Sequence, residues 1–341
     1  MKRKDITGQV FGRLKAAVLF AGGGVLDAAM MKYADKGLSV RLAVEGDPND
    51  PQLSNAIADV YSANYPDTHL LRQPVETVNF RNYYDNWFLL HASPSCKSFS
   101  NANTSKGGEK EKDLTAAIAV ARAIREMRPL YFTLEQVRGY VKSESFSIIY
   151  NTLVELEYAI CFDVVNAASY SVPQDRERMC LIAHRGNSLV GMPVRQRPVS
   201  WMDALAHRID YMNFAEPTVT QKQALYEHRL LYPDTEAFLV QRLSIRDDVR
   251  IRHPYELAPT ITCAIFTDSK GANRKSFLNI WYKGQWLDLS VRDCAILQSI
   301  PDWYYLPPQS RIAGAVVGNG VPTKLYEAIL GQIFKHYESQ N

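Results

Sequence analysis

The chain has 341 residues, enough for one large domain and a smaller one. Hydrophobic residues make up 46% of it and charged residues 22%, as is ordinary for a globular protein, and no apolar run approaches the length of a membrane span. The net charge is only +3, so a nucleic-acid partner would have to meet a local basic surface.

The cysteines are odd in number and widely spaced: Cys96, Cys161, Cys180, Cys263 and Cys294. No CxxC or Cys/His pair has the spacing of metal ligands, so the sequence predicts neither a disulfide framework nor a metal site. The N-terminus is basic but lacks a secretory cleavage pattern. We therefore expect a cytoplasmic protein with no membrane partner and no metal.

Short apolar runs alternate with amphipathic ones as far as residue 185, which predicts an α/β domain with a mainly parallel sheet. The expected strands are 16–20, 40–45, 87–91, 130–135, 159–166 and 179–183. The expected helices are 26–36, 55–64, 114–127, 146–157 and 323–337. The texture changes near Gly186, where prolines and glycines become frequent, so we expect a second domain over 186–309.

The first expected strand ends in a glycine-rich turn made of Phe20, Ala21, Gly22, Gly23 and Gly24. Such a turn lets a ligand approach the backbone closely, although glycines also serve tight turns without a ligand. The second strand ends in Glu45, whose carboxylate suits both hydroxyls of a ribose. Together they favour a nucleoside-containing cofactor, and the spacing does not match the GxGxxG of dinucleotide sites.

The third expected strand runs into a loop of small residues that contains Cys96. A thiol there is reachable as a nucleophile, whereas a lone cysteine is more often packed and inert. The next strand ends at Glu135, and neighbouring parallel strands place their ends together, so Glu135 is expected to converge with Cys96. The alternative for Glu135 is a surface carboxylate at a strand end.

Two further segments carry polar groups in a regular pattern. Gln174, Arg176 and Arg178 share one face of an extended segment, where they suit a carbonyl or phosphate oxygen, although a salt-bridged strand edge explains the same letters. The segment 317–322 initiates the last helix and offers Asn319 to a ligand, although a plain Gly/Pro turn would look the same.

The ordered set of segments resembles the C5 cytosine-specific DNA methyltransferases over nearly the whole chain. The matching segments are 20–24, 43–47, 94–100, 135–137, 174–178, 289–302 and 318–322. In order, they resemble the family's S-adenosylmethionine loop, ribose-binding segment, Pro-Cys loop, Glu-Asn-Val motif and Gln-x-Arg-x-Arg motif. The last two are similar to the element after the target-recognition region and to the closing motif.

The resemblance implies a Rossmann-like S-adenosylmethionine-dependent methyltransferase fold with a doubly wound mixed sheet. Residues 1–185 and the C-terminal helical part, 310–341, would form the catalytic and cofactor-binding domain, and 186–309 the target-recognition domain. The implied cofactor is S-adenosylmethionine, and the implied partner is double-stranded DNA, which a monomer would bind. The family's bacterial and phage members would place the protein in the cytoplasm, at the nucleoid.

The resemblance also implies a role for each matching residue. Cys96 would add to C6 of a flipped-out cytosine, Glu135 would contact N3 and the exocyclic amine, and Arg178, supported by Arg176, would bind O2. The residues implied for the cofactor are Phe20, Ala21, Gly22, Gly23, Gly24, Glu45, Asn319 and Val321.

Four positions depart from the family pattern. Ser95 stands directly before the cysteine where proline is usual, Gln136 replaces an asparagine, and Asp293 replaces a glutamate. The acidic residue expected near 73–76 to hold the adenine is not evident. The alternatives to a DNA methyltransferase are an enzyme of the same fold that acts on cytosine in tRNA and a catalytically silent DNA-binding relative. A nicotinamide dehydrogenase is a more distant alternative.

Overall fold

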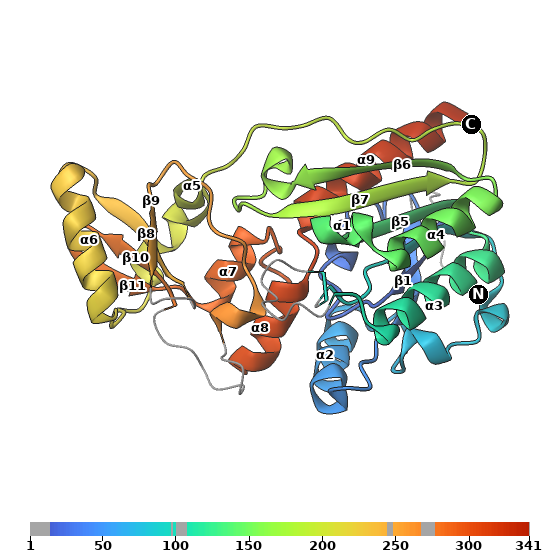
Figure 1. Cartoon of the computed structure of the whole chain (residues 1–341), viewed down its shortest axis with the longest axis horizontal. Helices are drawn as coiled ribbons and strands as arrows, with labels where there is room; N and C mark the ends of the chain where they lie inside the picture. The colour runs from blue at the N-terminus through green and yellow to red at the C-terminus, as the bar shows by residue number, and fades with distance from the viewer. Residues whose placement is uncertain (1–13, 97, 100–107, 244–247, 267–276, 341) are drawn as a thin grey trace, which may run out of the picture. The chain divides into compact units, whose positions relative to one another are not determined.

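The protein is described by a computed structural model over residues 14–96, 98–99, 108–243, 248–266 and 277–340 (Figure 1). Its contacts divide the chain into two compact units. The first unit takes in residues up to 166, then 177–195, and the chain from 323 onward, and the second takes in 167–176 and 196–322. Residues 310–322, expected from the sequence to complete the catalytic domain, therefore cluster with the second unit.

The first unit is built on a seven-stranded sheet with the order β3-β2-β1-β4-β5-β7-β6. The neighbours among β1 to β5 pair in parallel, whereas β7 runs antiparallel between β5 and β6. The strands are β1 (Leu14–Leu19), β2 (Leu38–Val44), β3 (His69–Leu71), β4 (Trp87–Ala92), β5 (Tyr131–Gln136), β6 (Ala159–Asn166) and β7 (Glu177–His184).

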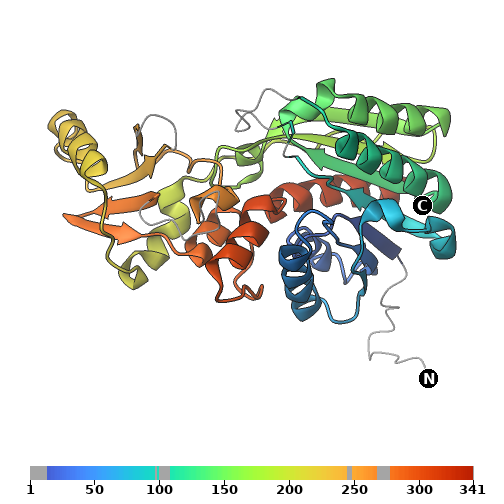
Figure 2. The same cartoon turned by 60° about the horizontal axis from the view of Figure 1, so that its bottom comes forward.

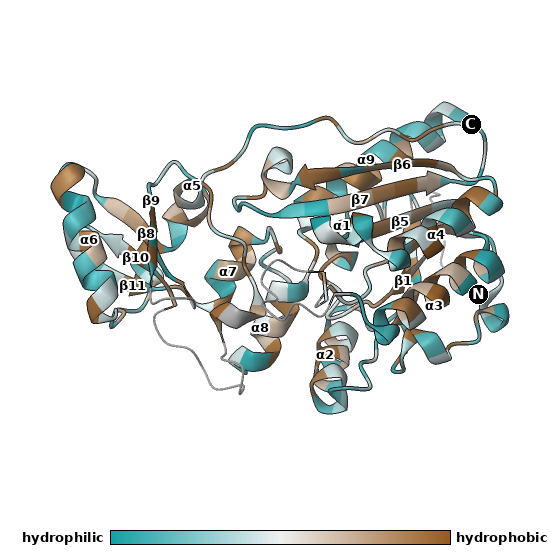
Figure 3. Cartoon of the chain, in the orientation of Figure 1, coloured by the Kyte–Doolittle hydropathy of each residue, from teal (hydrophilic) through white to brown (hydrophobic). Residues whose placement is uncertain are grey.

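Helices cover both faces of this sheet (Figures 1 and 2). One face packs into a core with α3 (Glu111–Met127) and α4 (Glu144–Glu155), and the other meets α9 (Thr323–Gln340). The helices α1 (Asp27–Met31) and α2 (Pro51–Asn64) complete the unit, and α1 lies against α9. The strands are largely brown in Figure 3, as expected for strands buried between two helical layers.

The side-chain alternation of β4 and β5 sorts their residues between these two faces. Leu90 and Phe132 join the core under α3 and α4, whereas His91 and Thr133 face Tyr326 of α9. His91 pairs directly with Thr133 in the parallel register. The residues two positions further on, Ser93 and Glu135, consequently follow on the α9 side.

The predicted fold class, a Rossmann-like methyltransferase fold with a mixed sheet, is confirmed. The sequence missed β3, which has only three residues, and it predicted too long a helix for α1. That α-helix ends at Met31 because the following turns use tighter bonds, such as those from the N–H of Ala34 to Met31 and from the N–H of Lys36 to Tyr33. Among the described helices, none is long and apolar enough to cross a membrane.

The second unit contains a four-stranded antiparallel sheet with the order β11-β10-β8-β9. Leu225, Phe238, Val240 and Trp281 form a small core between this sheet and a helix. Its strands and helices are α5 (Trp201–Leu205), α6 (Val219–Leu231), β8 (Ala237–Arg242), β9 (Val249–Arg252), β10 (Leu278–Tyr282), β11 (Gln285–Asp288), α7 (Val291–Leu297) and α8 (Ser310–Asn319).

The 3-10 helices within the described residues are short. They are η1 (Val75–Thr77), η2 (Phe80–Tyr83), η3 (Arg138–Lys142), η4 (Ala167–Tyr170), η5 (Ala206–Tyr211) and η6 (Cys263–Ile265).

Candidate active site

The glycine-rich turn after β1 has a backbone that few side chains tolerate. Phe20, Gly22 and Gly24 have φ angles of 57°, 55° and 82°, in the left-handed region. At Gly24 a Cβ atom would also lie 2.4 Å from the ring of Tyr65, so this position requires glycine. The turn is held by the N–H of Ala21, which donates to Val44 at 3.0 Å.

Glu45 follows β2 and lies against this turn. Its Oε2 accepts the N–H of Gly22 at 2.8 Å, and its Oε1 accepts the Ser54 hydroxyl at 3.2 Å. Burial raises the pKa of Glu45, and these two hydrogen bonds act in the opposite direction. Because a carboxylate has about four acceptor sites, the two bonds leave capacity for a ligand hydroxyl.

The turn and Glu45 offer features that suit a ligand with hydroxyl groups, such as the ribose of S-adenosylmethionine. A Cβ atom at Gly22 would meet nothing within 4 Å, so there is space beside the backbone next to the Glu45 carboxylate. Asn319 ends α8 and Val321 follows it, and both belong to the second unit. Their part in cofactor binding stays a prediction.

Cys96 lies four residues beyond the end of β4, in the first unit, and is partly exposed. The loop that carries it is tied to β5, because the side-chain amide of Gln136 donates to the carbonyl of Pro94. The Gln136 carbonyl oxygen in turn accepts the N–H of Val137 at 2.9 Å. Gln136, one of the departures from the family pattern, therefore helps to fix this loop to the neighbouring strand.

Glu135 lies beside the loop, at the end of β5, and is 8% exposed. Its Oε1 pairs with Nε of Arg178 on β7 at 2.8 Å, and its Oε2 accepts the Ser93 hydroxyl at 3.4 Å. The structure thus brings Glu135 and Arg178 together, next to the loop that carries Cys96. In Figure 3 this start of β7 is teal, whereas the rest of the strand is brown.

Arg176 is placed differently from Arg178. It belongs to the second unit, where its guanidinium donates to the carbonyls of Ile261, Gly318 and Gly320 at 2.8, 3.3 and 3.2 Å. These described contacts are those of a residue that holds loops together. Its predicted support of Arg178 stays a prediction.

Gln174 belongs to the same buried cluster of the second unit. Its amide donates to the carbonyl of Leu297 at 2.8 Å and to Oε1 of Gln298 at 2.6 Å, and Gln298 donates to Val317 at 2.7 Å. Gln298 lies in the matching segment 289–302, but its sequence did not reveal this buried contact. A glutamine in the otherwise apolar end of an amphipathic helix was the available signal.

Sequence reasoning also missed three polar residues on the α9 side of the sheet. They are His91, Thr133 and Tyr326, and a chain of hydrogen bonds joins them to Ser93. The available signal was alternation: His91 and Ser93 occupy alternate positions of a strand and loop that are otherwise apolar or small.

The other cysteines differ in exposure. Burial raises the pKa of both Cys180 and Cys294, so these thiols stay protonated and unreactive. In the described ranges no three His, Cys, Asp or Glu side chains are grouped so that they could hold a metal ion.

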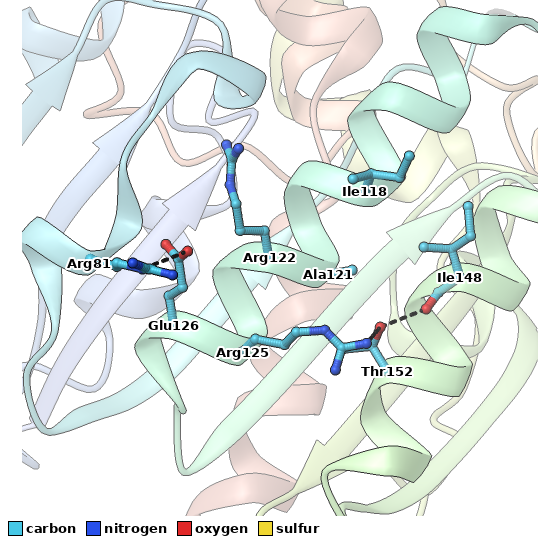
Figure 4. Close-up of a pocket in the computed structure, with 8 residues that line it drawn as sticks. All are labelled: Arg81, Ile118, Ala121, Arg122, Arg125, Glu126, Ile148 and Thr152. Atoms are coloured by element: carbon cyan, nitrogen blue, oxygen red, sulfur yellow. Dashed lines mark hydrogen bonds and ion pairs between the residues drawn. The ribbon is translucent and has the colours of Figure 1, made fainter.

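A groove of about 510 Å³ lies elsewhere in the first unit, along α3 and α4 (Figure 4). Its arginines are already engaged: Arg81 pairs with Glu126 at 3.5 Å, and Arg125 donates to Thr152 at 3.2 Å. Arg122 donates to two backbone carbonyls. The groove is lined from the C-terminal half of α3, whereas the site is at the carboxyl ends of the strands.

The fold and this cluster define a class: an α/β methyltransferase whose polar groups gather at the carboxyl edge of a mixed sheet. The family model described as "C-5 cytosine-specific DNA methylase" matches residues 14–335. The chain therefore belongs to this family. The predicted resemblance and the predicted enzyme class, a DNA (cytosine-5) methyltransferase, are confirmed.

Two curated relatives are Type II methyltransferases. M.AplI of Arthrospira platensis is 26% identical over 250 residues, which cover 71% of this chain and 66% of the relative. In that match the chain thus spans about two thirds of the relative. M.HhaI of Haemophilus parahaemolyticus is 24% identical over 359 residues, covering 96% of this chain and 95% of the relative.

Solved structures support the fold. One is described as a DNA modification methyltransferase encoded within a prophage of E. coli, with a TM-score of 0.66 and 19% identity, covering 95% of this chain and 99% of that one. The Dnmt2 methyltransferase of S. pombe has a TM-score of 0.60 at 14% identity, covering 95% and 99% of the two chains. At these identities the likeness concerns the fold alone.

Proposed function

We propose that the protein transfers a methyl group from S-adenosylmethionine to C5 of a flipped-out cytosine in double-stranded DNA, through a covalent bond between Cys96 and C6. The observation that carries the proposal is the position of Glu135. It lies between Ser93 and Arg178, beside the loop that delivers Cys96. Membership of the cytosine-specific family supports the choice of base.

Cys96 would supply the nucleophile. C5 of cytosine is a weak nucleophile by itself, and addition of the Cys96 thiolate to C6 turns the ring into an enamine whose C5 can accept an electrophile. S-adenosylmethionine, when bound, would supply the methyl group as that electrophile, with S-adenosylhomocysteine as the leaving group. Removal of the C5 proton by a base then lets the C5–C6 double bond re-form as the Cys96 thiolate leaves.

Glu135 and Arg178 would stabilise the ring during the addition. Charge moves from the thiolate into the ring as the C6–S bond forms, so N3 and O2 become more basic. N3 would take up a proton as it becomes more basic, so the Glu135 carboxylate would accept the N3–H and an N–H of the exocyclic amine, and Arg178 would donate to O2. The ion pair between them, with 10% and 12% exposed side chains, holds the two groups next to each other.

Glu45 and the turn at Gly22 would hold the cofactor. The carboxylate is positioned to accept ribose hydroxyls, and the backbone at Gly22 leaves space for the ligand. Asn319 and Val321 are proposed as further contacts, on the strength of the sequence resemblance alone.

The second unit would supply recognition of the DNA sequence. A cytosine inside a stacked duplex cannot reach a protein thiol, so the base must first leave the stack. Cationic and aromatic side chains are present in this unit, for example Arg229 over the ring of Trp281 at 4.1 Å. Such groups suit contacts with phosphates and bases.

The decisive experiment offers the purified protein labelled S-adenosylmethionine together with duplex DNA or with tRNA. Label in the DNA is the expected result. Bisulfite sequencing then maps the methylated sites after expression of the protein in cells that otherwise lack cytosine methylation. Label in tRNA alone would replace DNA by RNA as the substrate. If the protein binds a duplex that contains 5-fluorocytosine but forms no covalent adduct with it, the protein is a catalytically silent relative.

A further inference from the structure

The α9 side of the sheet carries a row of buried polar residues that the proposed reaction does not yet use. His91 and Thr133 are each 1% exposed and lie opposite one another on β4 and β5. Buried polar groups are retained where each has a hydrogen-bond partner. These two residues hydrogen-bond to each other, and His91 is linked to Glu135 through Ser93.

The row is a continuous chain of hydrogen bonds. Oη of Tyr326 lies 2.9 Å from Oγ1 of Thr133, which lies 2.9 Å from Nδ1 of His91. Nε2 of His91 lies 2.7 Å from Oγ of Ser93, and Oγ of Ser93 lies 3.4 Å from Oε2 of Glu135. The last contact is long, as contacts at an active site often are before a substrate is bound.

The positions of the protons follow from the order of these hydrogen bonds. The Glu135 carboxylate accepts from Arg178 on its other oxygen, so it is an acceptor for the single proton of Ser93. Ser93 must then accept from Nε2–H of His91. Nδ1 of His91 accepts from the Thr133 hydroxyl, and that oxygen accepts from Tyr326.

The imidazole in the middle of the chain is neutral. A neutral imidazole has one donor and one acceptor nitrogen, which is what its two neighbours require. Burial lowers the pKa of His91 to about 3, so the imidazole stays unprotonated near neutral pH and keeps one donor and one acceptor nitrogen. Burial also raises the pKa of Tyr326, so its hydroxyl keeps the proton that this order has it donate to Thr133.

We propose that His91 and Ser93 are positioning residues for Glu135. His91, held as the Nε2–H tautomer, orients the Ser93 hydroxyl toward Oε2, while Arg178 fixes Oε1 from the opposite strand. Donors on both sides stop the carboxylate from rotating, so it presents a fixed edge to the base. The inference rests on the proposed function, in which Glu135 contacts the cytosine.

The test compares single-turnover methyl transfer to duplex DNA in Ser93→Ala, His91→Phe and His91→Gln. Ser93→Ala and His91→Phe are expected to lower the rate by about 10- to 100-fold, as small displacements of a reacting group can do. His91→Gln keeps an N–H donor toward Ser93 and is expected to restore most of the rate. The dissociation constant of S-adenosylmethionine should stay unchanged in all three variants.

Ser188→Ala is the matched control. Ser188 also bonds to a histidine of the first unit, with Oγ 2.9 Å from Nε2 of His336, but it belongs to no part of the proposed site. Its variant is expected to keep the wild-type rate. A Ser93→Ala rate equal to that of this control would overturn the inference, as would a failure of His91→Gln to restore what His91→Phe loses.

A second measurement reads the chain without any methyl transfer. Nitrogen-15 NMR of labelled histidine, assigned with His91→Gln, should show His91 as the neutral Nε2–H tautomer down to about pH 5, since its pKa is far lower. The Nδ1–H tautomer would overturn the inference. A wild-type protein that methylates no DNA yet shows the Nε2–H tautomer would instead contradict the proposed function and leave the hydrogen-bond order established.

Discussion

Arg176 and Arg178 are two residues apart in one motif, and the structure gives their guanidinium groups different kinds of partner. Arg176 donates to three backbone carbonyls of the second unit. Arg178 pairs with a carboxylate at the carboxyl edge of the sheet of the first unit. Carbonyl partners fix loops in place, whereas an ion pair at a sheet edge keeps two charged groups ready for a ligand. The letters of the motif do not distinguish the two uses.

The largest expected effect is at Cys96, the proposed nucleophile. Cys96→Ser should lower turnover by at least about 1,000-fold, because a serine hydroxyl is a far weaker nucleophile than a thiolate. Binding of S-adenosylmethionine, measured by calorimetry, should be nearly unchanged. Cys263→Ser, at an exposed cysteine of the second unit, is the control and should stay active. Turnover retained in Cys96→Ser would show that another group is the nucleophile.

Substitutions of the two arginines test whether Arg176 contributes more to stability than Arg178 does. Arg176→Lys should lower the free energy of unfolding by about 3 kcal/mol, because one ammonium group cannot replace a planar guanidinium toward three buried carbonyls. Arg178→Lys should have a smaller effect on stability and a larger one on methyl transfer. Urea titration and single-turnover rates measure the two. A larger loss of stability in Arg178→Lys than in Arg176→Lys would contradict this difference between the two arginines.

Asp27 is a buried carboxyl near the glycine-rich turn, and its protonation makes the stability of the protein depend on pH. Burial raises the pKa of Asp27 from 3.8 to about 7. Between these values the folded protein holds a proton that the unfolded chain has lost, so stability falls as pH rises from about 4 to 7. From pH 5 to 7 the loss due to Asp27 should be about 2 kcal/mol, since one pKa unit corresponds to about 1.4 kcal/mol.

The Asp27→Asn variant supplies the test of this pH dependence. Because asparagine does not titrate, its free energy of unfolding should fall less than that of the wild type over the same pH range. Parallel curves for the two proteins in urea titrations at several pH values would show that Asp27 does not cause the slope.

The smallest expected effect concerns Glu45, a partly buried carboxylate with a proposed ligand. Glu45→Ala should raise the dissociation constant of S-adenosylmethionine by about tenfold, roughly the value of one hydrogen bond to a charged group. Ser54→Ala, which removes only a neighbour that donates to Glu45, should change it less. An unchanged dissociation constant in Glu45→Ala would exclude the ribose contact.

Much of the fold could be predicted because its signals are local. Apolar runs and amphipathic helices follow from periodicities of two and 3.6 residues, and six of the seven strands of the first unit were predicted near their observed positions. The short strand β3 was missed because three residues carry too little pattern. The helix α1 was predicted too long because its turns change from α-helical to tighter bonds without a change in composition.

The family could be predicted from the sequence, whereas the contacts between the site's residues could not. The sequence by itself identified the family and led to the proposal of Cys96, Glu135 and Glu45 for the site, because strand ends and turns mark where parallel strands present side chains. Only the tertiary structure decided that His91 and Thr133 face Tyr326, and that Arg176 and Arg178 have different partners. The physical reason is that a hydrogen bond depends on register and direction between segments far apart in the chain, which a linear pattern of residue types does not contain.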